Sequence, residues 1–255
     1  LNTSTGLGIV AISFAMAIGQ FVWGAAQPVF GAIADRYGPG RVIVAGALML
    51  AVGMAATPFA SSQWALVLSL GVLSAAGAGA GSFSILIGAT ARHLPAERRA
   101  FAAGFINAGG SLGQFVFAPL SQAIIAAFGW VAAMITLAVS ALATIPLARG
   151  LEARPAAVAV AATTSALTAG PTLRQQLRDA ARNPSYWCLH AGFFTCGFHI
   201  AFLVTHLPGE VDLCGLSASV AAGSLAIIGL ANLAGSLTVG ALGNVYRMKW
   251  LLFWT

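Results

Sequence analysis

The chain consists largely of long apolar runs that contain no Asp, Glu, Lys or Arg. A helix needs about 20 mostly apolar residues to cross the hydrocarbon core of a bilayer, and a charged residue at its centre would cost about 2.5–3.5 kcal/mol on insertion scales. The runs that meet both conditions are 8–33, 42–60, 65–90, 101–125, 129–148, 184–206 and 217–242, and a further one begins near Trp250. The sequence therefore predicts an all-α membrane protein with seven spans and the start of an eighth.

Composition excludes the main alternatives to membrane helices. Charged residues make up 7% of the 255 residues and hydrophobic ones 59%, against about 25% and about 45–50% in soluble domains. An outer-membrane barrel would need segments that alternate apolar and polar residues, whereas these runs are apolar all round. The three cysteines have no clustered spacing, so neither a disulfide framework nor a metal site is expected, and no cofactor is predicted.

The positive charges define an orientation. All twelve Lys and Arg residues lie in alternate loops: after the first, third, fifth and seventh runs. By the positive-inside rule these loops are cytoplasmic. We therefore expect a multi-pass protein of the inner (plasma) membrane, with residue 1 outside and the loop 150–183 inside. The formal net charge of +6 is then a topology signal, and the lipid bilayer rather than a nucleic acid is the expected partner.

The loop 150–183 separates a helical bundle, 1–149, from the beginning of a second, 184–255. Residues 31–38 and 240–247 align at an offset of 209, with Gly, Ala and Tyr matched, each at the cytoplasmic end of an inward-running helix. Internal repeats of this kind are typical of secondary transporters, in which two halves move about a central site.

The end of this loop differs from its Ala/Thr-rich middle. Leu173 and Leu177 share one helical face, and arginines at 174, 178 and 182 share another. This spacing predicts a short amphipathic helix lying on the inner leaflet. Asn183 and Pro184 are expected to be the N-cap and first residue of the next span.

Three stretches resemble a known family. Gly31 to Arg41, in the form G-x-x-A-D-R-x-G-x-x-R, resembles the loop signature of the major facilitator superfamily, found there between helices two and three. Residues 98–113 are similar to the pattern entering helix five of monocarboxylate-transporter-like members, and 193–208 to helix seven of bacterial members of that branch. The resemblance covers nearly the whole chain. It implies a twelve-helix fold of which this sequence is a fragment holding helices 2–8.

The resemblance also implies a cytoplasmic gate motif, in which Asp35 and its neighbours latch the two halves together. The motif residues are Gly31, Asp35, Arg36, Gly38 and Arg41. Asp35 follows the C-terminal end of a helix, where the macrodipole disfavours an anion, so it requires a cation or another helix N-terminus nearby. The alternative is a solvated turn with a local Asp–Arg pair.

Polar residues inside the spans are candidates for the substrate pathway. His199 falls near the midplane with Thr195 on its face, and His190 points the opposite way, whereas His206 belongs to the outer rim. The full candidate set is His199, Asn107, Gln114, Thr195, Asn232 and His190. Each has a structural alternative, because histidines and amides in lipid-embedded helices also serve as hydrogen bonds between helices.

The series Gly77-x-Gly79-x-Gly81 invites a nucleotide-binding interpretation. It lies within an apolar run and has no preceding strand, so the context of a phosphate-binding loop is absent. Close packing of helices is the prediction here.

The leading functional hypothesis is a secondary or facilitative transporter of a small organic solute. A monocarboxylate-like anion follows from the resemblance, although run 217–242 carries no Arg, whereas several organic-anion carriers of this kind have one. All six carboxylates lie outside the runs, so proton symport would have to use a histidine or helices outside this sequence, and uniport stays open. The alternative is a seven-helix receptor. A membrane enzyme is disfavoured because the spans offer no carboxylate, and no catalytic residue is predicted.

Overall fold

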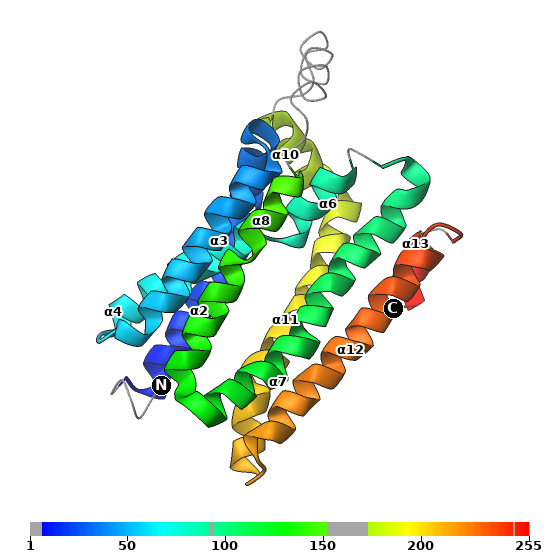
Figure 1. Ribbon diagram of the computed structural model, residues 1–255. Coiled ribbons are helices and arrows are strands. Elements are labelled where there is room, and N and C mark those ends of the chain that lie inside the picture. The colour runs from blue at the N-terminus through cyan, green and yellow to red at the C-terminus, as the bar shows by residue number, and fades with distance from the viewer. Residues whose placement is uncertain (1–6, 92–93, 152–172, 247, 255) are drawn as a thin grey trace. The chain divides into compact units, whose positions relative to one another are not determined.

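A computed structural model describes residues 7–91, 94–151, 173–246 and 248–254, which are helices joined by short turns (Figure 1). Their contacts define two units, Leu1–Glu152 with Ala226–Thr255 (unit 1) and Ala153–Leu225 (unit 2). The predicted external position of residue 1 and the Ala/Thr-rich middle of the loop, 152–172, lie outside the described residues.

Unit 1 holds most of the helices. In chain order they are α2 (Ile9–Tyr37), α3 (Pro39–Ala56), η1 (Thr57–Phe59), α4 (Gln63–Leu66), η2 (Val67–Ser74), α5 (Ala75–Ala80), α6 (Phe83–Ala91), α7 (Ala96–Leu142), α8 (Thr144–Ala148), η3 (Arg149–Leu151), the later part of α12 (Ala218–Leu242) and α13 (Met248–Trp254). Unit 2 contains α10 (Leu173–Arg182), α11 (Pro184–Leu213) and the first residues of α12. The predicted runs therefore all correspond to helices.

Six helical segments in the described part of the chain are long and apolar enough to cross a membrane, one fewer than predicted. The difference lies in Glu97–Ala148, which counts as one segment of 52 residues. At 1.5 Å per residue it would be about 78 Å long, far beyond the about 30 Å of a hydrocarbon core. Gly129 breaks it, with φ 83° and ψ 168°, and α7 turns back at its lower end in Figure 1. The predicted division between runs 101–125 and 129–148 is thus present as a tight turn.

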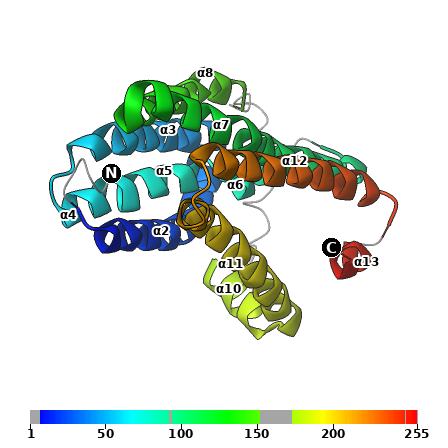
Figure 2. The same ribbon diagram turned by 90° about the horizontal axis from the view of Figure 1, so that it is seen from below.

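The first spans pack through glycines. Helix α5 lies between α2 and α3 (Figure 2). A Cβ on Gly77 would lie 2.6 Å from the carbonyl oxygen of Gly46 on α3, and one on Gly79 would lie 3.1 Å from the carbonyl oxygen of Trp23 on α2. These backbones approach closely only because side chains are missing. The interpretation of this glycine series as a packing feature is confirmed.

The third span is less regular than its apolar run suggests. Residues Val67–Ser74 form a π-helix, and the Ser74 hydroxyl donates to the Ser69 carbonyl oxygen five residues earlier, at 2.9 Å. Thr57, which is fully buried, donates to the Gly53 carbonyl oxygen at 2.8 Å. Both hydroxyls are buried, and that of Ser74 lies where a Cβ at Gly53 would be. They supply hydrogen bonds to a backbone whose regular α-helical pattern is interrupted.

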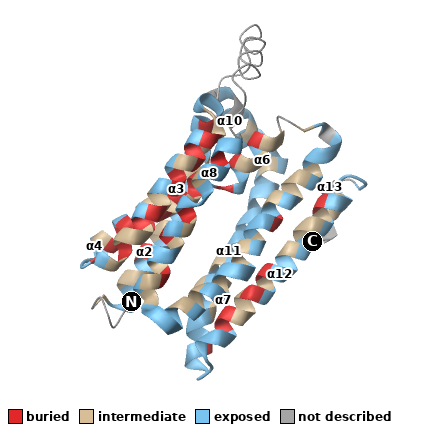
Figure 3. Ribbon diagram, in the orientation of Figure 1, coloured by how far each residue is buried: buried red, intermediate tan, exposed pale blue. Residues whose placement is uncertain are grey.

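Large apolar side chains face outward as well as inward. Phe21 is 75% exposed and Phe128 is 77% exposed, and many of the buried residues lie along α3 and the helices beside it (Figure 3). In water such a surface would be costly, at roughly 25 cal/mol per Å². Together with the apolar spans it identifies a multi-pass integral membrane protein.

Unit 2 confirms the predicted helix start. The Asn183 side chain accepts a hydrogen bond from the Ser185 N–H at 2.9 Å, and Pro184 is the first helical residue. The helix extends past the predicted end at 206 to Leu213, through Pro208. It ends where Gly215 adopts a φ of 71°, a conformation that favours glycine, so a glycine and not the proline sets the boundary.

Candidate functional site

The corner between α2 and α3 is built on one glycine. Helix α2 ends at Tyr37 and α3 begins at Pro39, so Gly38 alone joins them. It has φ 94° and ψ 143°, and its N–H donates to the Ala34 carbonyl oxygen at 2.9 Å. Only glycine adopts this conformation without strain, and proline at the first helical position starts α3 at once. The second glycine of the predicted gate motif is therefore required by the backbone.

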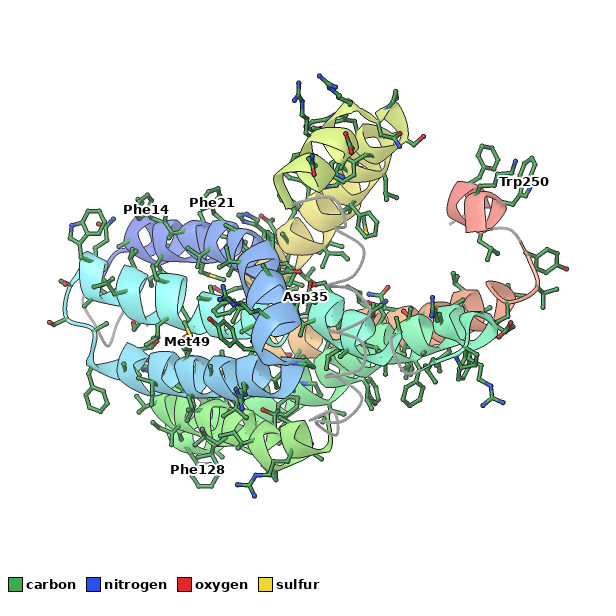
Figure 4. The ribbon with its side chains drawn as sticks, turned by 90° about the horizontal axis from the view of Figure 1, so that it is seen from above. Phe14, Phe21, Asp35, Met49, Phe128 and Trp250 are labelled. Carbon is green, nitrogen blue, oxygen red and sulfur yellow. The ribbon has the colours of Figure 1, made fainter. Side chains whose placement is uncertain are left out.

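The charged residues of the motif surround this corner on its exposed side. Asp35, Arg36 and Arg41 are all exposed, and the Arg36 guanidinium lies 5.4 Å from the centre of the Tyr37 ring. Figure 4, viewed onto this end of unit 1, shows Asp35 on α2, with Phe14 and Phe21 projecting from the outer side of the same helix. The corner thus presents both signs of charge at the edge of an apolar bundle.

Beneath these charges the corner is firmly packed. Ala34 is buried with Val42 and Ile43 in a cluster that includes residues of α5, α6 and α8. Gly31 differs, because a Cβ added there would meet nothing within 4 Å. The backbone conformation therefore explains Gly38, whereas packing within unit 1 gives Gly31 no structural requirement.

Helices α7 and α12 form the second feature, an antiparallel contact made by small residues. A Cβ on Gly104 would lie 2.7 Å from the Gly240 Cα. Farther along, a Cβ on Gly229 would lie 2.9 Å from the Ser111 carbonyl oxygen and 2.8 Å from the Phe115 nitrogen. We call this contact the α7–α12 seam.

One hydrogen bond crosses the seam. The Asn107 side-chain amide donates to the Ser236 hydroxyl at 2.8 Å, between residues 129 positions apart in the chain. Gln114 is half-buried two turns along α7 from Asn107, and Asn232 is exposed one turn from Ser236. The structure therefore places three of the candidate pathway residues along α7 and α12 of unit 1.

Ser236 was not among the predicted site residues. Its position relative to the glycines of α12 could have indicated a contact. Ser236 lies seven residues after Gly229 and four before Gly240, so the three residues share one helical face. Such small-residue spacing indicates a helix contact without indicating the partner.

The histidines belong to unit 2, on α11. The His190 Nδ1 atom lies 2.9 Å from the Tyr186 carbonyl oxygen, which can only accept, so this nitrogen carries a proton. The imidazole also lies 4.0 Å from the centre of the Tyr186 ring. His190 therefore belongs to an aromatic cluster at the start of the helix.

The other candidates on α11 are farther along the helix. The Thr195 hydroxyl donates to the Ala191 carbonyl oxygen at 3.1 Å, and His199 is exposed one turn later. His206 lies against Phe202, with ring centres 4.9 Å apart. His199 and Thr195 share a face, as predicted from their spacing.

These residues can bind a small polar molecule. Within the described residues no three His, Cys, Asp or Glu side chains are grouped so that they could hold a metal ion. Amides, hydroxyls and imidazoles donate and accept hydrogen bonds and can recognise a small polar solute.

Comparison with known proteins agrees with these features. The sequence profile of the Major Facilitator Superfamily matches residues 1–255. Monocarboxylate transporter 13 of Bos taurus is 31% identical over 96% of this chain and 56% of its own length. The oxalate:formate antiporter of Oxalobacter formigenes is 26% identical over 86% of this chain and 51% of its own length. A probable sulfoacetate transporter of Cupriavidus necator is 33% identical over 53% of this chain and 30% of its own length.

The chain thus spans about half the length of the first of these relatives. Because the family profile matches the whole of the present sequence, the chain belongs to the major facilitator superfamily, a family of solute transporters.

Proposed function

We propose that the full-length protein is a secondary or facilitative transporter of small organic anions of the monocarboxylate type, working by alternating access. The observation that carries the proposal is the similarity to monocarboxylate transporter 13 over 96% of the chain. Relatives named for sulfoacetate and for oxalate and formate support small organic anions as the substrate class, since each of these solutes carries a carboxylate group.

In this proposal the α2–α3 corner is a cytoplasmic gate. Asp35, Arg36 and Arg41 would exchange partners as the halves of the transporter move, while Gly38 keeps the corner tight. Packing in unit 1 does not require a glycine at position 31. In this proposal Gly31 would leave room for another segment that approaches the corner in a different conformational state of the transporter.

The arrangement of unit 1 supports a cytoplasmic position for this corner. The α2–α3 corner, the end of α6 with the start of α7, and the end of α8 lie at one end of the unit, whereas α4 and the turn within α7 lie at the other (Figure 1). The first group holds all the cations between residues 36 and 149, which the positive-inside rule assigns to the cytoplasm.

The substrate pathway in this proposal uses the neutral polar residues of the spans. Asn107, Gln114 and Asn232 would contribute from unit 1, and Thr195, His199 and His190 from unit 2. The hydrogen bond between Asn107 and Ser236 would open and close with the transport cycle. A co-transported proton would be carried by a histidine, with His199 the first candidate since it is exposed within its span.

The test is uptake of radiolabelled monocarboxylates by the full-length protein in proteoliposomes, with and without an inward proton gradient. Saturable uptake that excess unlabelled substrate inhibits is expected, whereas no uptake of any small carboxylate would refute the proposed substrate class. Asp35→Asn should reduce uptake, because it removes the carboxylate of the proposed gate. Asp179→Asn, an equal charge change on α10, serves as the matched control.

A gradient that accelerates uptake would identify symport, and His199→Gln should then abolish the acceleration while His206→Gln retains it. An uptake rate that does not depend on the proton gradient would indicate facilitated transport instead.

A further inference from the structure

The junction of α10 and α11 carries arginines and a tryptophan that the proposed transport pathway does not use. A single residue, Asn183, separates the two helices. The Trp187 indole N–H, on the first turn of α11, donates to the Ala181 carbonyl oxygen in the last turn of α10 at 2.8 Å. This hydrogen bond fixes the indole beside the end of α10. We call this region, Leu173–His190, the α10–α11 corner.

Aromatic rings set the depth of the corner in a membrane. Trp187 packs edge-to-face on Tyr186, with ring centres 6.1 Å apart, and Tyr186 contacts His190. Trp187 remains 59% exposed. Tryptophan and tyrosine prefer the headgroup level of a bilayer. Because the indole is bonded to α10, that helix lies at the same level.

Helix α10, which would lie at the headgroup level, carries a net positive charge. The helix has three Arg and one Asp, a net charge of +2. Arg178 and Arg182 are four residues apart, hence on one face, and both are exposed. Among the described residues neither has an ion-pair partner.

The N-terminus of α11 is not available to bind an anion, because its first N–H groups already have partners. The Ser185 N–H bonds to the Asn183 side chain, and the Tyr186 N–H bonds to the Asn183 carbonyl oxygen at 3.1 Å. An anion at this corner must therefore be bound by the guanidinium groups, which suit phosphate oxygens.

We propose that the α10–α11 corner is a docking surface for anionic phospholipid headgroups of the inner leaflet, with Arg178 and Arg182 binding the phosphate and Trp187 fixing the depth. The positive charge of α10 and its position at the headgroup level together indicate this ligand. Anionic lipids concentrate in the cytoplasmic leaflet, and basic segments beside a membrane span bind them. The surface would hold the loop against the membrane while the rest of the transporter moves.

The test uses the full-length protein in a neutral detergent, with native mass spectrometry counting retained phosphatidylglycerol or phosphatidylcholine. The variant Arg178→Gln/Arg182→Gln should lower the affinity for phosphatidylglycerol about 25-fold, since each arginine at an anionic surface contributes about fivefold. Retention of phosphatidylcholine should stay the same. Arg178→Lys/Arg182→Lys should keep most of the affinity, and Trp187→Phe, which removes the indole N–H without changing charge, should weaken it by less than the loss of both arginines does.

The matched control is Arg98→Gln/Arg149→Gln, which removes the same charge from exposed positions of unit 1. An equal loss of phosphatidylglycerol in both double variants would overturn the proposal, because total charge would then explain the binding. No loss in Arg178→Gln/Arg182→Gln would overturn it as well. Glycerol 3-phosphate at the lipid concentration should not compete, whereas effective competition would identify a site for small anions in place of a lipid surface. Circular dichroism of each variant verifies that the helices are retained.

Discussion

Replacing Gly77 by alanine is expected to destabilise the first helical layers of unit 1. The glycine lies where α5 crosses α3, and its added Cβ would meet two backbone groups, the Gly46 carbonyl oxygen at 2.6 Å and the Leu50 nitrogen. Neither belongs to a flexible side chain that could rotate away. The two helices must therefore separate.

The magnitude follows from the distance. Ordinary contact begins at 3.4 Å, so the 2.6 Å approach is 0.8 Å too short. A gap of 0.5–1 Å forfeits about a quarter to a half of the dispersion attraction between the atoms along the contact, and overpacking in proteins costs about 1–3 kcal/mol. We expect Gly77→Ala to cost about 1–3 kcal/mol, equivalent to a fall in Tm of about 2–4 °C for each kcal/mol.

Thermal unfolding of the full-length protein in detergent, followed by intrinsic fluorescence, measures this effect. Gly24→Ala is the matched control, because the same substitution on α2 places its Cβ in open space. Its Tm should stay equal or rise slightly, since alanine favours helix over glycine. Equal Tm values for the two variants would refute the argument that the α3–α5 crossing depends on the missing side chain.

Three further predictions concern the gate corner, the seam and the loop. Gly38→Ala should cost about 1–3 kcal/mol because its backbone conformation excludes other residues, while Gly31→Ala leaves Tm unchanged; equal stability of the two variants would contradict this. In a double-mutant cycle with Asn107→Ala and Ser236→Ala, measured by SDS-induced unfolding, the coupling should be about 0.6 kcal/mol, and strict additivity would show that the seam hydrogen bond contributes nothing. Asn183→Ala should cost about 1 kcal/mol through loss of the N-cap, seen as faster hydrogen exchange in the first turn of α11, and unchanged exchange there would argue against the cap.

Several local features could be predicted from the sequence because their causes are local. The N-cap at Asn183, the amphipathic helix ending at Arg182 and the break near Gly129 all follow from residues within one or two turns. The π-helix of Val67–Ser74 could not be predicted, because its serines pack against residues of earlier elements: Ser74 at Gly53 of α3 and Ser69 at the Thr57 hydroxyl of η1.

The candidate site shows the same limit. Asn107 was predicted as a polar residue of its span, with both a pathway and an interhelical role open. The hydrogen-bond partner, Ser236, was not foreseen. Its position in the sequence indicates a helix contact but cannot name a residue 129 positions away.

The sequence by itself determined that the chain spans a membrane, which stretches form its helices, and which helix ends carry positive charge. These properties follow from the transfer of single segments between water and lipid, which depends on composition along the chain. The tertiary structure decided which faces meet: Gly77 against α3, Gly104 against Gly240 and Asn107 against Ser236. In lipid both faces of a helix are apolar, so periodicity does not mark the buried side, and only close packing and hydrogen bonds between helices select it.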